Sequence, residues 1–506
     1  MPSELPPLPN FEHLRKQAKS LLNEYREEKP QAKARLEALG LSPRRAARLA
    51  DAQRAVAREY GFASWAKLKK HVEAAAAENA NPLEQIKHAF RANDAATVAA
   101  LLECHPPLRA GINDPALAFG ATPILCAAQR GRREMIDVLL RYGADINARS
   151  DWWAGGFGIL DTADPDLAAF LIERGARVDA HAAARLGMID RLKDLVSANP
   201  ELVHARGGDG KLPLHCASTI EIAEYLLDHG AEIDARDIDH ESTAAQYMVA
   251  SRPDVARFLI SRGCKTDILM AAAVDDLDLV RRHLSEDPQS IRTRVSDEYF
   301  PMVREKGGGT IYQWELGWYV SAHQVARKFD HEAVFKFLME HTPADEKLLV
   351  ACWLHDRELV KPLLSDQPDL ARMLPGAARR HPAHAGHNND TAAVGLMLDA
   401  RFPVDARGRH GATPLHWAGF HGNDVMASII LRHSPPLEQT DDDFKSTPLG
   451  WAIHGSEHGW NSSTGDYAAT VRLLLDAGAK PPEKLAGTPA VRQELRRHGV
   501  KDTAST

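Results

Sequence analysis

The sequence predicts an all-α fold, a solenoid of short two-helix repeats joined by short β-hairpin turns. Three observations predict this fold class. The first is a dodecapeptide, residues 411–422, which reads Gly-Ala-Thr-Pro-Leu-His-Trp-Ala-Gly-Phe-His-Gly. The second is the recurrence of its Thr-Pro helix start at Thr122-Pro123 and Thr447-Pro448. The third is a glycine that ends a helix at intervals of 32 or 33 residues, as in the pairs Gly143 and Gly175, and Gly230 and Gly263.

The residues of the dodecapeptide have physical roles in starting, burying and ending a helix. Thr413 can cap a helix, and Pro414 suits the first helical position, where no N–H donor is missed. Leu415 and Ala418 supply a buried face, and Gly422 ends the helix. The unit resembles the opening of an ankyrin repeat, which has about 33 residues and two antiparallel helices. This resemblance implies an ankyrin-repeat α-solenoid that recognises a protein partner.

The chain is expected to divide into three parts. Residues 1–80 resemble a helical segment found ahead of ankyrin arrays in bacterial proteins, and they are expected to form a helical bundle that caps the array. An independent binding domain is the alternative for this segment. Residues 82–480 are expected to hold about 12 repeats, with insertions at 294–320 and 455–465. Residues 481–506 are expected to form a C-terminal cap helix and a polar tail.

Charge and cysteine usage narrow the function classes. The 506 residues carry a net charge of -7, with 15 basic and 10 acidic residues in the first 80. A nucleic-acid-binding face needs clustered basic residues, so no nucleic-acid partner is expected. Nucleic-acid binding through the basic first 80 residues is the weaker alternative. The five cysteines are scattered, and the sequence shows neither a secretion signal nor an apolar stretch of membrane-spanning length. A cytoplasmic protein is expected, with no membrane partner.

Function is expected where the repeat pattern is interrupted, because plain repeats only satisfy packing. Aromatic side chains on loops of a rigid scaffold give large contact areas at low entropic cost. Two interruptions are therefore candidate binding sites, and their tryptophans are Trp152, Trp153, Trp314 and Trp318. The run Thr310–Val320 has high β propensity and predicts a hairpin. Trp460 is less favoured, because its loop lies between helices on the edge away from the hairpins. The alternative is that these aromatics pack back onto the array.

Motif position predicts further binding residues. In ankyrin repeats the partner face comprises the hairpin tips and the exposed end of the first helix. On this basis the face includes Gln129, Arg130, Lys328, Phe329, Phe420, His421 and His454. Phe420 and His421 are expected to point outward. His215 and His416 occupy the histidine position of the motif, where the side chain ties turns together, and Trp417 and Trp451 are expected in the core.

The alternative function is an enzyme or small-molecule binder with a pocket formed by the aromatic insertions. Its candidate acid–base residues are Glu315, Glu457, His458 and Asp466. No phosphate loop, nucleophile elbow or dinucleotide fingerprint is present, so no cofactor is expected.

Two histidine clusters are candidate metal sites. His381, His384 and His387 spread around a helix and do not converge unless the helix is distorted. The segment His454-Gly-Ser-Glu-His458 lacks the His-Glu-x-x-His order, and its glycines disfavour a helix. No metal site is therefore expected.

Overall fold

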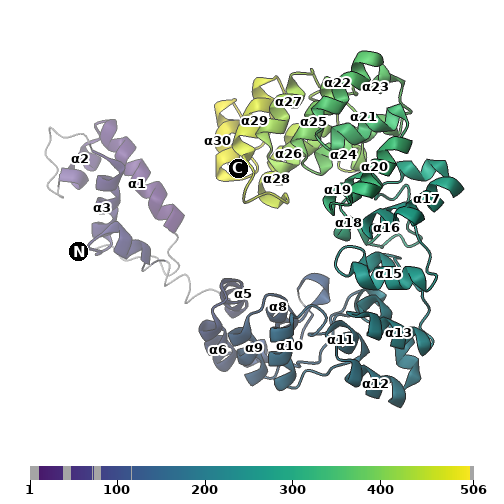
Figure 1. Cartoon of the computed structure of the whole chain (residues 1–506). Coiled ribbons are helices and arrows are strands. Elements are labelled where there is room, and N and C mark those ends of the chain that lie inside the picture. Colours follow the sequence, from purple (N-terminus) through teal and green to yellow (C-terminus); the bar gives the residue numbers. More distant parts are fainter. Residues whose placement is uncertain (1–10, 38–46, 71, 73–80, 116, 502–506) are drawn as a thin grey trace. The chain divides into compact units, whose positions relative to one another are not determined.

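The computed structural model describes residues 11–37, 47–70, 72, 81–115 and 117–501. The chain forms two compact units, Met1–Trp152 with Gly156–Arg177, and Trp153–Gly155 with Val178–Thr506. Both units are built from helices and turns (Figure 1). Within the described ranges, β structure is limited to two isolated bridges, Arg236 to Thr243 and Arg294 to Ser321. The all-α fold class is confirmed. No described helix is both long enough and apolar enough to cross a bilayer.

The N-terminal helices of the first unit pack on one another around an apolar stripe. They are α1 (Phe11–Arg26), α2 (Pro30–Glu37) and α3 (Leu49–Glu59). Leu14, Ala18 and Leu21 are buried between them. The rings of Phe11 and Trp65 lie 5.2 Å apart. Residues 1–10, 38–46, 71 and 73–80 of the predicted N-terminal segment, and 502–506 of the predicted tail, lie outside the described residues.

The remainder of the first unit consists of paired short helices. They are α5 (Pro82–Ala92), α6 (Ala95–Cys104), α7 (Pro106–Ala110), η1 (Ala118–Gly120), α8 (Pro123–Gln129), α9 (Arg133–Arg141) and α10 (Pro165–Glu173). Asparagine side chains join successive turns. Asn113 donates from Nδ2 to Gly143 O at 3.2 Å and accepts from Asp145 N at 2.8 Å. Asn147 makes the same two bonds to the following turn. These bonds fix one turn against the next.

A glycine at one of these turns should resist substitution. Gly120 has φ +63°, and a Cβ added there would lie 2.3 Å from the backbone oxygen of Asp151. Gly131 has a similar φ of +64° but open space around it. Gly131→Ala should therefore cost only the left-handed strain of about 1–2 kcal/mol. Gly120→Ala should cost about 3 kcal/mol or more, because the backbone must also move. Hydrogen exchange in α8 measures both, and equal losses would contradict the prediction.

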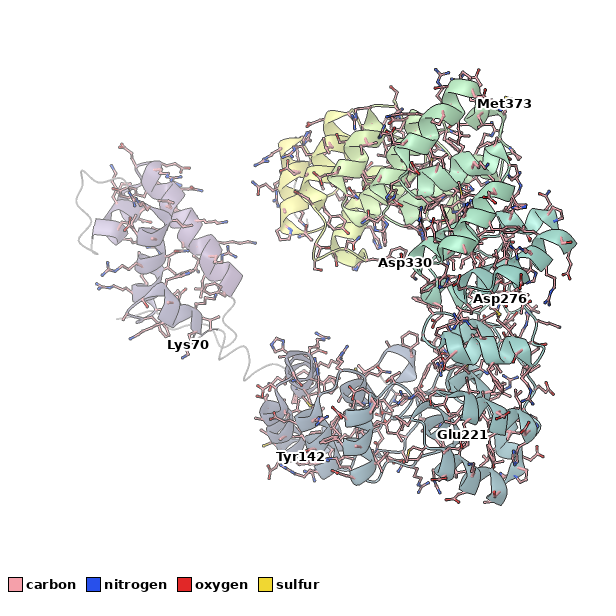
Figure 2. The ribbon with its side chains drawn as sticks, in the orientation of Figure 1. Lys70, Tyr142, Glu221, Asp276, Asp330 and Met373 are labelled. Carbon is pink, nitrogen blue, oxygen red and sulfur yellow. The ribbon has the colours of Figure 1, made fainter. Side chains whose placement is uncertain are left out.

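The second unit continues the helix pairs. Its first part contains α11 (Ala180–Arg185), α12 (Ile189–Ala198), η2 (Pro200–His204), η3 (Gly208–Gly210), η4 (Pro213–Cys216), α13 (Ile220–Asp228), α14 (Ala244–Met248), α15 (Pro253–Ser261), α16 (Ile268–Ala273), α17 (Leu277–Glu286), η5 (Pro288–Arg292), α18 (Tyr312–Glu315), α19 (Ala322–Lys328) and α20 (Glu332–His341). Aspartates begin several of these helices. Asp276, labelled in Figure 2, accepts from Leu279 N at 2.9 Å and caps α17.

The last part of the second unit has two layers of helices. It contains α21 (Ala344–Trp353), α22 (Arg357–Asp366), α23 (Leu370–Met373), η6 (Ala378–Arg380), α24 (His381–His387), α25 (Thr391–Asp399), η7 (Arg409–Gly411), α26 (Pro414–His421), α27 (Asp424–Leu431), α28 (Pro448–His458), α29 (Tyr467–Asp476) and α30 (Pro489–Arg497). Helices α24, α26 and α28 are neighbours in one layer, and α25, α27 and α29 are neighbours in the other (Figure 1). The final helix α30 packs on α29 through buried Val491 and Leu495.

The insertion at 294–320 packs back onto the turn at 237–242. The backbone N–H groups of Val303 and Arg304 each donate to the Glu241 carboxylate at 2.9 Å. Tyr312 is fully buried, and its hydroxyl donates to Asp267 at 2.9 Å. The predicted hairpin at 310–320 is wrong, because the run instead contains the short helix α18. Its β propensity is outweighed by the burial and hydrogen bonding of Tyr312.

The segment 454–458 is helical, which corrects the expectation that its glycines disfavour a helix. Helix α28 runs through His458 and includes Gly455. A Cβ at Gly455 would lie 2.5 Å from the carbonyl oxygen of Phe420. Glycine is therefore needed here for the close approach of α26, and the tertiary contact offsets its low helix propensity.

Candidate functional site

The two motif histidines tie turns together, as the sequence predicted. His215 and His416 are 2% and 0% exposed. Nδ1 of His416 accepts from Thr413 N at 3.1 Å, and Nε2 lies 3.1 Å from Ser446 O. His215 makes the equivalent pair of bonds. This pattern requires a neutral ring that accepts at Nδ1 and donates at Nε2. Burial also favours the neutral ring, because it lowers the pKa of His215 to about 3 and that of His416 to about 4.

Several predicted binding residues are exposed. Gln129, Arg130 and His454 are exposed. Trp153 is 39% exposed and Trp314 is 71% exposed. Other predicted residues contact neighbouring side chains or backbone. Trp152 is half-buried, with its ring 4.9 Å from that of Phe119. Lys328 is exposed and donates from Nζ to the carbonyl oxygens of Glu315 and Leu316 at 3.1 and 3.0 Å, and Phe329 beside it is half-buried.

The predicted binding residues Trp318, Phe420 and His421 belong to one cluster, which we call the aromatic–imidazole patch. It consists of Trp318, His387, Trp417, Phe420, His421 and Trp460. The Trp460 ring lies 5.4 Å from His387, 6.0 Å from Trp417, 5.2 Å from Phe420 and 5.6 Å from His421. The Trp318 ring lies 5.7 Å from His387. Trp460 is 64% exposed, whereas Trp318 and Phe420 are half-buried.

His421 belongs to the floor of the patch, which corrects the expectation that it points outward. It is 3% exposed. Asn461 donates to its Nδ1 at 3.0 Å, and its Nε2 therefore donates to His387 O at 3.0 Å. Helix α26 is packed between α24 and α28, so its last residue turns toward the neighbouring repeat. Trp417 and Trp451, 2% and 6% exposed, are core residues as predicted.

The floor of the patch carries ring nitrogens without hydrogen-bond partners among the described residues. They are Nε1 of Trp318, Nε1 of Trp417 and Nε2 of His387. Nδ1 of His387 lies 3.2 Å from Asn388 Oδ1 and donates to it, so Nε2 is a free acceptor. Burial lowers the pKa of His387 to about 4, which keeps this ring neutral near pH 7. Within the described part of the chain, two donors and one acceptor are therefore buried and unsatisfied beneath the apolar ring faces.

The other histidines of α24 support the patch from behind. His384 stacks on Tyr319 at 3.7 Å, and His381 accepts from Trp353 Nε1 at 2.9 Å. Burial lowers the pKa of His384 to about 3 and that of His381 well below its usual value. The rings of His381 and His384 both contact Tyr319, at 5.1 and 3.7 Å, whereas the ring of His387 contacts tryptophans of the patch. No group of three His, Cys, Asp or Glu side chains placed to hold a metal ion occurs in the described part of the chain.

The candidate acid–base residues mostly have structural partners. Glu457 pairs with Arg492 at 3.6 Å, and Asp466 caps α29 by accepting from Ala469 N at 2.9 Å. His458 is exposed, with its ring 4.8 Å from His454. Burial raises the pKa of Glu315, and the cations Arg252 and Lys328 oppose this shift.

The insertion at 294–320 borders a cavity of about 220 Å³. Its lining includes His240, Glu241, Tyr299 and Phe300. Neither Trp314 nor Trp318 lines it, so this cavity is not the tryptophan-lined pocket of the enzyme hypothesis.

Comparison with known families decides the classification. Residues 119–151 match the model of a single ankyrin repeat, and residues 180–270 match a model of three ankyrin repeats. This chain is an ankyrin-repeat protein. Ankyrin repeats act in general as protein-interaction scaffolds, because their stacked units present extended binding surfaces.

Two human proteins are similar to this ankyrin-repeat protein. Transient receptor potential cation channel subfamily A member 1 is 23% identical over 409 residues, which cover 72% of this chain and 31% of the channel subunit. Ankyrin repeat and SOCS box protein 16 is 24% identical over 267 residues, which cover 52% of this chain and 51% of that protein. This chain thus spans about a third to a half of the length of these relatives.

Sequence reasoning missed part of the patch for a clear reason. Trp460 is disfavoured by sequence because its loop lies between helices, on the edge away from the hairpins, yet its ring packs against residues of α24 and α26. A usable signal was present, because His387 and His421 lie 34 residues apart, as do Trp417 and Trp451. Equivalent positions one ankyrin repeat apart are neighbours in space.

Proposed function

We propose that this ankyrin-repeat protein binds a segment of a partner protein across the aromatic–imidazole patch. The observation that carries the proposal is the state of Trp460, which is 64% exposed but held in place. Its neighbour Asn461 bonds to His421, and Gly459 N donates to Gly455 O at 2.7 Å. An exposed aromatic that is already ordered contributes contact area without a further loss of side-chain entropy on binding.

The composition of the patch suits a peptide side chain. Rings of Trp318, Phe420 and Trp460 supply partly exposed apolar surface. The guanidinium of Arg409 lies 5.3 Å from the Trp318 ring centroid and adds positive charge at the rim. Aromatic residues and arginine are the side chains that dominate binding energy in protein interfaces. A partner segment with an apolar side chain and an acidic neighbour fits this surface.

Replacing Trp460 by alanine is expected to weaken partner binding by about 30-fold or more, the effect of removing an interface hot spot. The test selects peptides from a random displayed library against the full chain and measures the affinity of the selected peptides by fluorescence anisotropy. Because the Trp460 side chain is mostly exposed, the variant should keep its helix content and thermal stability.

Trp314→Ala is the matched control, because Trp314 is still more exposed and makes no ring contact among the described residues. Selected peptides should bind this variant as they bind the original chain. Peptides that bind Trp460→Ala and Phe420→Ala normally, or a library from which nothing is enriched, would overturn the proposal. The predicted contacts at Gln129, Arg130 and Trp153 remain predictions outside the patch.

A further inference from the structure

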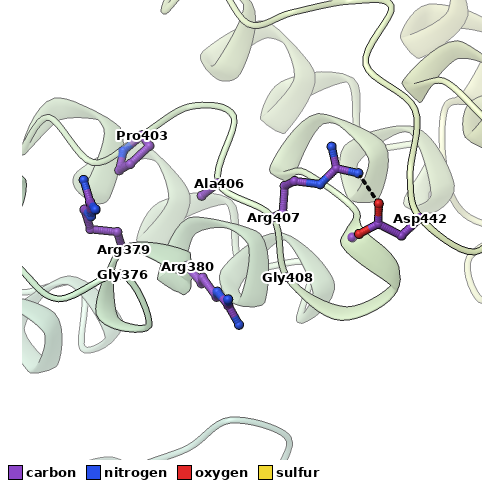
Figure 3. A pocket seen from close by; sticks show the side chains of 9 residues that line it. Gly376, Arg379, Arg380, Pro403, Ala406, Arg407, Gly408 and Asp442 are labelled. Atoms are coloured by element: carbon purple, nitrogen blue, oxygen red, sulfur yellow. Dashed lines mark hydrogen bonds and ion pairs between the residues drawn. The ribbon is translucent and has the colours of Figure 1, made fainter.

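A cavity of about 440 Å³ opens in the same repeats that carry the aromatic–imidazole patch. Its lining includes Arg379, Arg380, Pro403, Arg407, Gly408 and Asp442 (Figure 3). The residues come from the turn before α24 and from the turns before α26 and α28. Three successive repeats therefore contribute to one pocket.

The pocket has an excess of positive charge. Arg407 donates from Nη2 to Asp442 at 2.7 Å and to Thr440 O at 2.9 Å. Arg379 and Arg380 are exposed, and neither forms an ion pair with a described residue. In Figure 3 Arg407 is joined to Asp442, while the guanidinium groups of Arg379 and Arg380 meet no acidic side chain among those drawn. Asp442 thus balances only one of the three arginines.

The turn at 408–410 links the pocket to the patch. Gly408 lines the pocket, and a Cβ there would lie 2.9 Å from the Cβ of Ala383 and 3.7 Å from Cε1 of His384. The next residue, Arg409, covers the Trp318 ring. The ring of His410 lies 6.3 Å from that of Trp417. The turn at 408–410 therefore runs directly from the arginine pocket to the aromatic–imidazole patch.

We propose that this arginine pocket binds an anionic side chain, carboxylate or phosphate, of the partner segment that occupies the aromatic–imidazole patch. Guanidinium groups present paired N–H donors that match the oxygens of carboxylates and phosphates. Arginine clusters beside an apolar surface are a known mode of recognition of acidic and phosphorylated peptide motifs. The net charge of -7 disfavours the alternative of a nucleic-acid backbone. That the anion belongs to a partner segment rests on the proposed function.

The anion site is tested without a partner by arginine modification of the full chain. Each arginine is labelled with p-hydroxyphenylglyoxal, and its rate is read by mass spectrometry in chloride, succinate or inorganic phosphate at equal ionic strength. Phosphate is expected to slow labelling of Arg379 and Arg380 at least about threefold. Arg281 and Arg357, exposed arginines each paired with an aspartate, are the controls and should react at unchanged rates. Protection by succinate as well means that a carboxylate suffices, and protection by phosphate alone assigns a phosphorylated residue.

Equal labelling rates of Arg379 and Arg380 in all three salts, or equal slowing of the control arginines, would overturn the proposed anion site. Protection by a short oligothymidylate that exceeds protection by phosphate would overturn the assignment to a protein segment. The Trp460→Ala variant should retain the phosphate protection, so failure of the patch and failure of the pocket are separate results. The double variant Arg379→Gln/Arg380→Gln should bind the peptides selected on the patch about tenfold more weakly. The remaining affinity should depend less on salt concentration.

Discussion

Replacing Glu346 by glutamine is expected to lower the free energy of local unfolding around α21 by about 3–5 kcal/mol. Glu346 and Arg294 are each 2% exposed, and their side chains form an ion pair. Glutamine keeps the size of the side chain but removes its charge. The guanidinium of Arg294 then stays buried and charged without its anion, since arginine does not lose its proton in proteins. Amide hydrogen exchange of α19 and α21 measures the loss.

Replacing Arg294 instead of Glu346 should cost less stability. Burial raises the pKa of Glu346, so in Arg294→Met the carboxyl group can take up a proton and become neutral. Arg292, 3.3 Å from the same carboxylate, also remains as a partner. The double variant Arg294→Met/Glu346→Leu should recover most of the stability, because an apolar pair replaces the ion pair as a unit. A loss below about 1 kcal/mol in Glu346→Gln, or no recovery in the double variant, would contradict this account.

The ion pair also supports the aromatic–imidazole patch. The Arg294 guanidinium lies 5.7 Å from the ring centroid of Tyr319, and Tyr319 stacks on His384. Trp318 of the patch precedes Tyr319 in the chain. Damage to the pair should therefore reach the patch through Tyr319, whereas Trp460→Ala should affect binding with little effect on stability. Stability and recognition are thus separable by the choice of substitution.

The repeat architecture could be predicted because its signals are local. Pro123, Pro414 and Pro448 all stand at the first position of a helix, where the Thr-Pro pairs placed them. Gly143, Gly175 and the other helix-ending glycines have positive φ, as a left-handed helix end requires. These features depend on a few neighbouring residues, so one sequence suffices to recognise them.

The patch could be predicted only in part, because it depends on contacts between repeats. Trp318 and His387 lie 69 residues apart in the chain, and their meeting depends on how the insertion at 294–320 folds. That insertion is held by hydrogen bonds to Glu241 and Asp267, and no local sequence pattern predicts these bonds. The outward expectation for His421 failed for the same reason, since Asn461 and the carbonyl of His387 take both ring nitrogens.

Lowering the pH from 7 to about 5 is expected to loosen the second unit before the first. The unfolded chain binds a proton on each histidine near pH 6.5. Burial lowers the folded-state pKa of several histidines of the second unit, to about 3 for His215, His323 and His384 and to about 4 for His387 and His416. Between these values the unfolded state binds more protons than the folded state. Each such histidine therefore removes up to about 1.4 kcal/mol of stability for each pH unit lost.

The direction follows from the balance of buried groups. Asp237, Asp239, Asp267, Glu315 and Glu346 act in the opposite sense, because burial raises their carboxyl pKa and the folded state then binds the proton first. These five carboxyls are fewer than the seven described histidines whose pKa burial lowers, since His381 and His421 join the five named above. Each carboxyl also accepts hydrogen bonds or lies near cations that favour its charged form. Stability from the neutral histidines is therefore present above about pH 6.5 and is lost as the pH falls below it.

Hydrogen exchange at pH 7 and about pH 5, corrected for the intrinsic pH dependence of exchange, resolves the two units. Protection should fall in α14 and α26, whereas α8 and α9 should keep theirs, because no histidine with a described side chain in the first unit is buried. His416→Gln can replace both hydrogen bonds of the imidazole, since an amide has an acceptor and a donor but no proton to gain in this range. The variant should flatten the pH dependence of α26 by up to about 1.4 kcal/mol per pH unit. Equal losses in both units, or an unchanged slope in His416→Gln, would show that the buried neutral histidines do not set the acid limit of the fold.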